Sequence, residues 1–116
     1  MDIYKLADKE YAFASIVWEN EPIASGILVK LCEEKLNWKK STTYTVLKNL
    51  CNQGILKNDN AIVSSVIKQN EVQKYKSEQF IDKTFGGSMP KFINAFFSDK
   101  KLTEKEAAEI KDLIDR

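Results

Sequence analysis

Histidine is missing from the 116 residues, and cysteine is scarce, with Cys32 and Cys51 as the two examples. The absence of histidine excludes a histidine general base, a serine–histidine or cysteine–histidine pair, and a histidine-rich zinc site. Two isolated cysteines are usually small buried apolar side chains, and we expect that here. A redox sensor is the alternative, although no neighbouring residue marks either thiol as activated.

Long apolar runs and glycine-rich loops are also lacking. No stretch approaches the roughly 18 apolar residues that a membrane span needs, and the charged, helix-like N-terminus does not resemble a signal peptide. Only four glycines are present, and Gly86-Gly87 stands alone instead of in a phosphate-binding loop. These absences predict a cytoplasmic protein without membrane insertion, and one with no catalytic residues, no metal site and no cofactor.

The chain does have the composition of a folded domain, with 43% hydrophobic and 30% charged residues. Its net charge is only +1, so the overall charge does not indicate a nucleic-acid partner. The distribution is more informative, because residues 35–58 contain five lysines and no acid, whereas glutamates occur at 19, 21, 33 and 34. Such a basic patch is a weak indication of phosphate binding, and a solvated lysine face is the alternative.

Helical periodicity and turn signals divide the first 68 residues into four elements. The pattern predicts three helices, over about 8–19 with Asp8 as N-cap, over about 24–35, and from an N-cap at Ser41 to Gly54. β-Branched residues on both sides of Asn58-Asp59-Asn60 predict a short hairpin. Three helices followed by a hairpin is the order of a winged helix-turn-helix, so residues 1–68 are the expected DNA-binding domain.

Residues 69–116 are predicted to form three further helices. These would span about 70–85, follow an N-cap at Ser88, and follow a capping box at Thr103-Glu104-Lys105-Glu106. The tail has few residues with which to bury its phenylalanines, and each buried phenylalanine contributes roughly 1.5–3 kcal/mol. It either folds back on the first domain or pairs with a second copy. We favour a helical dimerisation region built on Phe80, Phe85, Phe92, Phe96, Phe97, Ile110, Leu113 and Ile114.

The third helix carries the candidate DNA contacts. At about 100° per residue, its apolar side chains share one face, and its polar side chains occupy the opposite face and the flanks. Threonine can bond a phosphate or a base edge, tyrosine can donate to a phosphate, and lysine can reach a phosphate or a guanine. The expected DNA-binding residues are Lys39, Lys40, Ser41, Thr42, Tyr44, Thr45, Lys48 and Asn49. The alternative is that these side chains are merely the solvated face of an amphipathic helix.

A family resemblance extends over nearly the whole chain. The run from Trp38 to Leu50, ending at Gly54-Ile55-Leu56, resembles the recognition helix of the penicillinase-repressor (BlaI/MecI/CopY) family. Ile16-Val17-Trp18 with Pro22-Ile23 is similar to the family's first helix and turn, and Phe85-Gly86-Gly87-Ser88 is similar to its tail. The resemblance implies a homodimeric repressor that binds a palindromic double-stranded operator through a winged helix. In the beta-lactam-responsive branch, it also implies a membrane sensor protease that triggers cleavage within the tail.

The chain departs from the family pattern at several positions. Asn49 stands where the family has an arginine late in the recognition helix, and Lys57 and Lys68 are the only cations of a short wing. The family's cleavage position falls at Ala95-Phe96, where the penicillinase branch has an Asn-Phe pair. No cysteine follows Cys51, which excludes copper sensing through the C-terminal cysteine cluster of the copper-responsive branch.

Together these features predict a sequence-specific transcriptional repressor with a mainly α fold, in which a winged helix-turn-helix with a small β-hairpin wing precedes a C-terminal helical dimerisation region. The family resemblance also implies control of beta-lactam resistance genes. The competing interpretation is a winged-helix module that binds a protein and no DNA, which the low charge of the wing favours.

Overall fold

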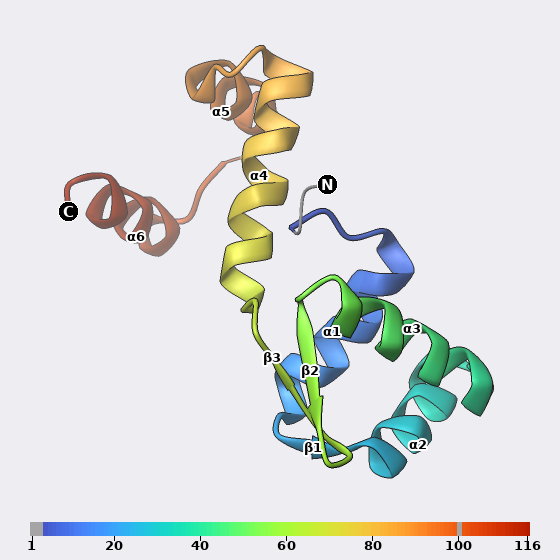
Figure 1. Cartoon of the computed structure of the whole chain (residues 1–116). Coiled ribbons are helices and arrows are strands. Elements are labelled where there is room, and N and C mark those ends of the chain that lie inside the picture. The colour runs from blue at the N-terminus through green and yellow to red at the C-terminus, as the bar shows by residue number, and fades with distance from the viewer. Residues whose placement is uncertain (1–3, 100) are drawn as a thin grey trace. The chain divides into compact units, whose positions relative to one another are not determined.

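The structure is a computed structural model that describes residues 4–99 and 101–116 (Figure 1). Its elements confirm the expected fold class, mainly helical with a small antiparallel sheet. The chain divides into two compact units, residues 1–77 and 78–116. In chain order the elements are α1 (Asp8–Asn20), β1 (Ile23–Ala24), α2 (Ser25–Leu36), α3 (Lys40–Asn52), β2 (Leu56–Asp59), β3 (Ile62–Ser65), α4 (Gln69–Phe85), α5 (Met89–Phe97) and α6 (Glu104–Ile114).

The sheet of the first unit has the strand order β1-β3-β2, and both pairings are antiparallel. β2 and β3 form the predicted hairpin, in which Asn58 lies opposite Val63. Its turn is made by Asn60 and Ala61, whose φ angles of 50° and 66° are both positive. Two consecutive positive φ angles are typical of the tight turns that match the twist of a hairpin. The sequence does not predict β1, because two residues are too few to show alternation.

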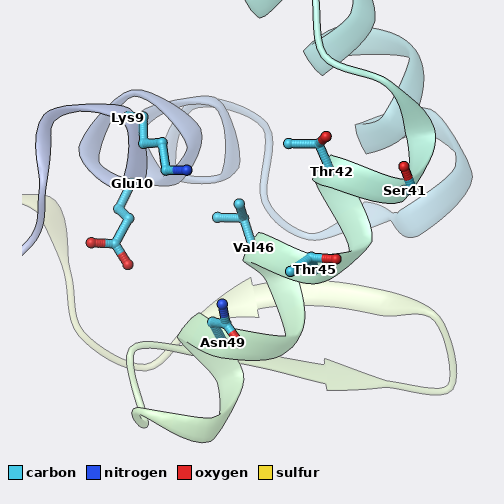
Figure 2. A pocket seen from close by; sticks show the side chains of 7 residues that line it. All are labelled: Lys9, Glu10, Ser41, Thr42, Thr45, Val46 and Asn49. Carbon is cyan, nitrogen blue, oxygen red and sulfur yellow. The ribbon is translucent and has the colours of Figure 1, made fainter.

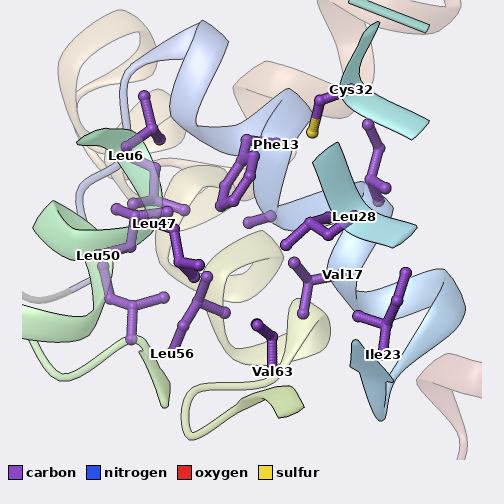
Figure 3. Close-up of a cluster of buried hydrophobic side chains, with 14 of the residues drawn as sticks. Leu6, Phe13, Val17, Ile23, Leu28, Cys32, Leu47, Leu50, Leu56 and Val63 are labelled. Atoms are coloured by element: carbon purple, nitrogen blue, oxygen red, sulfur yellow. The ribbon is translucent and has the colours of Figure 1, made fainter. Parts of the chain in front are cut away.

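One apolar core joins the three helices and the sheet of the first unit (Figure 3). α1 contributes Phe13 and Val17, and α2 contributes Leu28 and Cys32, each pair one helical turn apart and 0% exposed. α3 and the hairpin complete the core with Val46, Leu47, Leu50, Ile55, Leu56 and Val63. Truncating one such side chain to alanine typically costs 2–5 kcal/mol. The core therefore fixes α3 firmly against α1 and α2.

Two of the predicted helix caps are wrong. α1 has Ala7 at its N-cap, so Asp8 is its first helical residue. α3 has Lys39 at its N-cap, so Ser41 lies inside its first turn. At α1, a carboxylate oxygen of Glu10 accepts a hydrogen bond from the backbone N–H of Ala7 at 3.0 Å. This contact satisfies one orphan donor at the helix start without a polar side chain at the N-cap.

α4 belongs to both compact units, because the division falls between Ser77 and Glu78. Its first half is anchored in the first unit. The side chain of Val72 is 0% exposed, and the ammonium group of Lys76 lies 4.8 Å from the centroid of the Tyr11 ring. The functional division expected after residue 68, which assigns all of α4 to the tail, stays a prediction.

The two helices that lie wholly within the second unit, α5 and α6, begin at the predicted N-caps. The hydroxyl of Ser88 accepts a hydrogen bond from a backbone N–H of α5 at 3.2 Å. At α6, Thr103 and Glu106 form the capping box, with the Thr103 hydroxyl accepting from the Glu106 N–H at 3.1 Å. No helix in the described ranges 4–99 and 101–116 is both long and apolar enough to span a bilayer.

The phenylalanines of the second unit contact one another. Phe92 lies at the centre, with ring centroids 6.1 Å from Phe80, 5.6 Å from Phe85 and 5.8 Å from Phe96. None of the described side chains of this unit is buried, and Phe80 and Phe96 are half exposed. A single copy of this unit therefore forms an aromatic cluster and no closed core.

Candidate nucleic-acid interface

The turn between α2 and α3 fixes where the third helix begins. Asn37 ends α2 in the left-handed conformation, with φ 56°, which asparagine tolerates better than most residues. The backbone N–H groups of Asn37 and Trp38 then donate to carbonyls of the last turn of α2 at 3.1 and 3.3 Å. The Trp38 ring stacks on Phe13, with centroids 5.7 Å apart and planes at 12°. The start of α3 is thus tied to the core.

α3 separates its side chains as the helical periodicity predicts. Thr43, Val46, Leu47 and Leu50 are buried. Of the eight residues predicted to contact DNA, seven are exposed and Thr42 is half-buried. The 13 residues of this helix include no acid. The structure therefore presents the predicted residues on one outward helix surface that carries no carboxylate of its own.

The N-terminus of α3 leaves backbone donors available. Lys39, at the N-cap, makes no side-chain capping hydrogen bond, so its side chain leaves the first-turn N–H groups unoccupied. The dipole of the helix and these free N–H groups favour an anion at this end. The ammonium of Lys40 lies 5.9 Å from the centroid of the Tyr44 ring, which places both side chains beside the same end of the helix.

Grooves run along both sides of the outward surface of α3. One, of about 240 Å³, is lined by four of the predicted residues, together with Val46 and with Lys9 and Glu10 of α1 (Figure 2). The other, of about 360 Å³, is lined by Tyr44, Leu47, Lys48, Cys51, Asn52 and Asn58. Sequence reasoning did not include Lys9 or Asn58 in the interface, because each lies on another element and is brought there by tertiary packing.

Of the two lysines predicted for the wing, Lys57 and Lys68, one is paired with a carboxylate. Lys57 is exposed on β2. Lys68 is exposed as well, but its ammonium donates to the Ser65 carbonyl at 2.9 Å and to the Ser65 hydroxyl at 3.0 Å, and lies 3.5 Å from a Glu21 carboxylate oxygen. The same carboxylate accepts from the Ser65 N–H and hydroxyl, each at 2.9 Å. Lys68 therefore braces the base of the wing.

The arrangement of helices, wing and uncovered α3 agrees with the comparison with known proteins. Residues 6–116 match the family described as penicillinase repressor. This chain belongs to the penicillinase repressor family. The family is one of transcriptional repressors.

Several curated relatives of this penicillinase-repressor chain align over nearly its whole length. The methicillin resistance regulatory protein MecI of Staphylococcus aureus is 20% identical over 117 residues, covering 97% of this chain and 95% of the relative. The penicillinase repressor of Staphylococcus aureus is 22% identical over 109 residues, covering 90% and 86%. The penicillinase repressor of Bacillus licheniformis is 19% identical over 117 residues, covering 97% and 91%.

Neither cysteine of this penicillinase-repressor chain has the surroundings of an activated thiol. Cys32 is buried and Cys51 is half-buried. Burial raises the pKa of both thiols, and the nearby Thr43 hydroxyl only partly offsets this at Cys32. A raised pKa keeps the thiol protonated and disfavours the reactive thiolate. Within the described part of the chain, no group of three or more cysteine or acidic side chains could hold a metal ion.

The predicted dimerisation and cleavage residues all lie in the second unit. The five phenylalanines form the aromatic cluster, whereas Leu113 and Ile114 of α6 are 60% and 71% exposed. Ala95 and Phe96, at the family's cleavage position, are exposed on the last turn of α5. Their roles in a penicillinase repressor stay predictions.

Proposed function

We propose that this member of the penicillinase repressor family is a sequence-specific transcriptional repressor that binds a palindromic DNA operator as a homodimer. The observation that carries the proposal is the outward surface of α3, which presents hydroxyl, amide and ammonium groups and no carboxylate on a helix held by the core. The major groove of DNA admits an α-helix and displays donors and acceptors on the base edges. Such a helix surface is suited to that groove.

The residues of α3 divide into two roles. Thr45 and Lys48 lie one turn apart at the middle of the outward surface, where a bound helix faces base edges. Lys39, at the N-cap, and Lys40, beside Tyr44, are placed to contact the phosphate backbone, which positions the helix without reading sequence. Ser41 shares the face of Thr45 and Lys48, one turn earlier, and Thr42 and Asn49 flank that face. These three residues complete the proposed contact set.

Homodimer formation is supported by the second unit, whose described side chains form no buried core in one copy. Pairing two copies would cover the aromatic cluster and the exposed apolar residues of α6. A two-fold dimer presents two recognition helices to successive turns of DNA, which suits a palindromic site. The proposed interface comprises Phe80, Phe85, Phe92, Phe96, Phe97, Ile110, Leu113 and Ile114.

The names of the relatives supply the proposed target genes. They are described as methicillin resistance and penicillinase regulators, so we assign this chain to the control of beta-lactam resistance genes. We extend the assignment to release by a membrane sensor protease acting at Ala95-Phe96. Both residues lie in the last turn of α5, so cleavage requires local unfolding of a helix end, which is among the less costly openings of a fold. Incubation with the sensor's protease domain, followed by mass spectrometry, tests this step.

Operator binding is tested by fluorescence anisotropy with a labelled duplex from upstream of the gene, and with a shuffled duplex as control, at two salt concentrations. Tighter binding to the native duplex by about 10³-fold or more, with a steep loss of affinity in high salt, supports sequence-specific repression. Lys48→Ala should weaken specific binding selectively. Lys39→Ala should weaken binding to both duplexes and lower the salt slope by about 1 for each half-site. Unchanged affinity in both variants would overturn the assignment of α3.

A protein-interaction module is the second candidate, because Lys68 is paired with Glu21 and bonded to Ser65, which leaves Lys57 as the unpaired cation of the described wing. Absence of binding to either duplex at low salt would favour this candidate over operator binding.

A further inference from the structure

The groove of about 240 Å³ lies where the first turn of α1 meets the outward side of α3 (Figure 2). Helical spacing explains why Lys9 reaches it. Lys9 lies one turn before Phe13, whose buried side chain packs in the core. On α3, Thr42 likewise lies one turn before the buried Val46. Lys9 and Thr42 are therefore the positions at which the contact between the two helices opens to solvent.

The ammonium group of Lys9 is available for a ligand. No carboxylate among the described residues lies within ion-pair distance of it. In Figure 2 its side chain extends from α1 toward Thr42 and Val46. The adjacent Glu10 carboxylate accepts a hydrogen bond from the Ala7 N–H at 3.0 Å and also lines the groove. The groove thus places the Lys9 ammonium beside the hydroxyls of Ser41 and Thr42, with the Glu10 carboxylate as the one acidic group in its lining.

We infer that this groove receives one phosphate of the DNA backbone and that Lys9, a residue outside the helix-turn-helix, is its charged ligand. The inference rests on the proposed binding of DNA by α3. A phosphate oxygen accepts hydrogen bonds from an ammonium group and from hydroxyls, and the groove offers Lys9 together with Ser41 and Thr42. Because the contact is made from α1, it fixes the register of α3 along the duplex and carries no sequence information itself.

Three single substitutions test the inference, each checked for folding by circular dichroism. Lys9→Gln should weaken binding to the upstream and shuffled duplexes alike, by roughly 5- to 10-fold at about 0.1 M salt. It should also lower the salt slope by about 1.8, because a homodimer loses one phosphate contact in each half-site. Glu10→Gln keeps an acceptor for the Ala7 N–H and removes a negative charge, so it should strengthen binding to both duplexes by about 2- to 5-fold. Lys5→Gln is the matched control, since Lys5 is exposed but does not line the groove, and it should change affinity by less than about 2-fold.

Single methylphosphonate substitutions then locate the phosphate. Making one particular phosphate neutral in each half-site should weaken DNA binding by the wild-type protein. The same modification should leave DNA binding by the Lys9→Gln variant unchanged. A wild-type salt slope in Lys9→Gln, or an equal loss in Lys5→Gln, would overturn the inference while leaving operator binding in place. Absence of salt-dependent binding by the wild-type protein would instead overturn the proposed function, and the inference with it.

Discussion

Thr43 places a hydroxyl group on the buried side of α3, among apolar neighbours. The residue is 0% exposed. Among the described residues, its Oγ1 has the thiol of Cys32 nearby and no other hydrogen-bond partner. A thiol is a weak donor and a weak acceptor. A buried hydroxyl with no adequate partner lowers stability by an amount comparable to a lost hydrogen bond.

Thr43→Val should therefore raise the free energy of unfolding by about 0.5–1 kcal/mol, because valine has nearly the same shape and no hydroxyl to desolvate. Urea denaturation measures the change, and affinity for DNA should stay unchanged because the side chain faces the core. Thr45→Val is the matched control on the outward surface, with unchanged stability and weakened DNA binding. A loss of more than about 1 kcal/mol in Thr43→Val would show that the hydroxyl has a good partner.

Glu21 joins the turn after α1 to the base of the wing. Partial burial acts to raise the pKa of its carboxyl, but the hydrogen bonds from the Ser65 N–H and hydroxyl and the charge of Lys68 outweigh it. The pKa therefore lies below its ordinary value of 4.5. A lowered pKa in the folded state means that the carboxylate stabilises the fold above the unfolded pKa and stops doing so as the pH falls through the folded value.

Glu21→Gln should lower the free energy of unfolding by about 1 kcal/mol at pH 7, since it removes a charged acceptor. The difference from the wild-type protein should shrink as the pH falls below about 4.5. Thermal melts at pH 7, 5 and 3.5 measure it. Glu19→Gln is the control, because Glu19 is exposed and lies 3.9 Å from Lys35, a separation at which surface pairs contribute little. If Glu21→Gln and the wild-type protein differed in stability by the same amount at pH 7 and at pH 3.5, the stabilising role of the ionised carboxylate would be contradicted.

At the scale of elements, periodic features of the sequence were predictable and tertiary ones were not. The two faces of α3 follow from a repeat of 3.6 residues, so burial of Val46 and Leu50 and exposure of Lys48 could be predicted. β1 could not, because its two residues form a strand only through pairing with β3. The ion pair of Lys68 could not be predicted either, since its partner Glu21 lies 47 positions away in the chain.

The same contrast between periodic and tertiary features holds for the candidate interface. The outward residues of α3 could be listed from the sequence because they share one helix. Lys9 enters the groove only because α1 packs against α3, and sequence spacing alone does not reveal which helices touch. The turn that aims α3 depends on the left-handed backbone of Asn37, which no periodic pattern marks.

Asn37→Gly should leave stability within about 0.5 kcal/mol of the wild-type value, because glycine adopts a positive φ without strain. Asn37→Ala should lower the free energy of unfolding by about 1 kcal/mol, since alanine is strained at φ 56°. Because this turn sets the start of α3, the alanine variant should also weaken DNA binding. Chemical denaturation and anisotropy on both variants test this, and equal stability of the two would contradict it.

At the scale of the whole molecule, burial is distributed unequally between the compact units. The buried side chains of the described chain all belong to residues 4–77, including Val72 at the start of α4. The second unit has capped helices and an aromatic cluster, but its described side chains are exposed or half-buried. Helices of 9 and 11 residues are marginal without packing. The proposed pairing of two copies would cover the apolar residues that one copy of the unit leaves exposed.

Substitution of Leu113 and Ile114 together by lysine should separate that pairing from the fold of the first unit. The two side chains are 60% and 71% exposed in one copy, so lysine there should leave the monomer's stability nearly unchanged. Light scattering at micromolar concentration should give twice the 13.3 kDa chain mass for the wild-type protein and the single mass for the variant. The variant should bind an operator more weakly, because two unlinked half-site contacts lose their effective concentration. Lys105→Gln, on the same helix, should change neither result, whereas a monomeric wild-type mass would contradict the dimer.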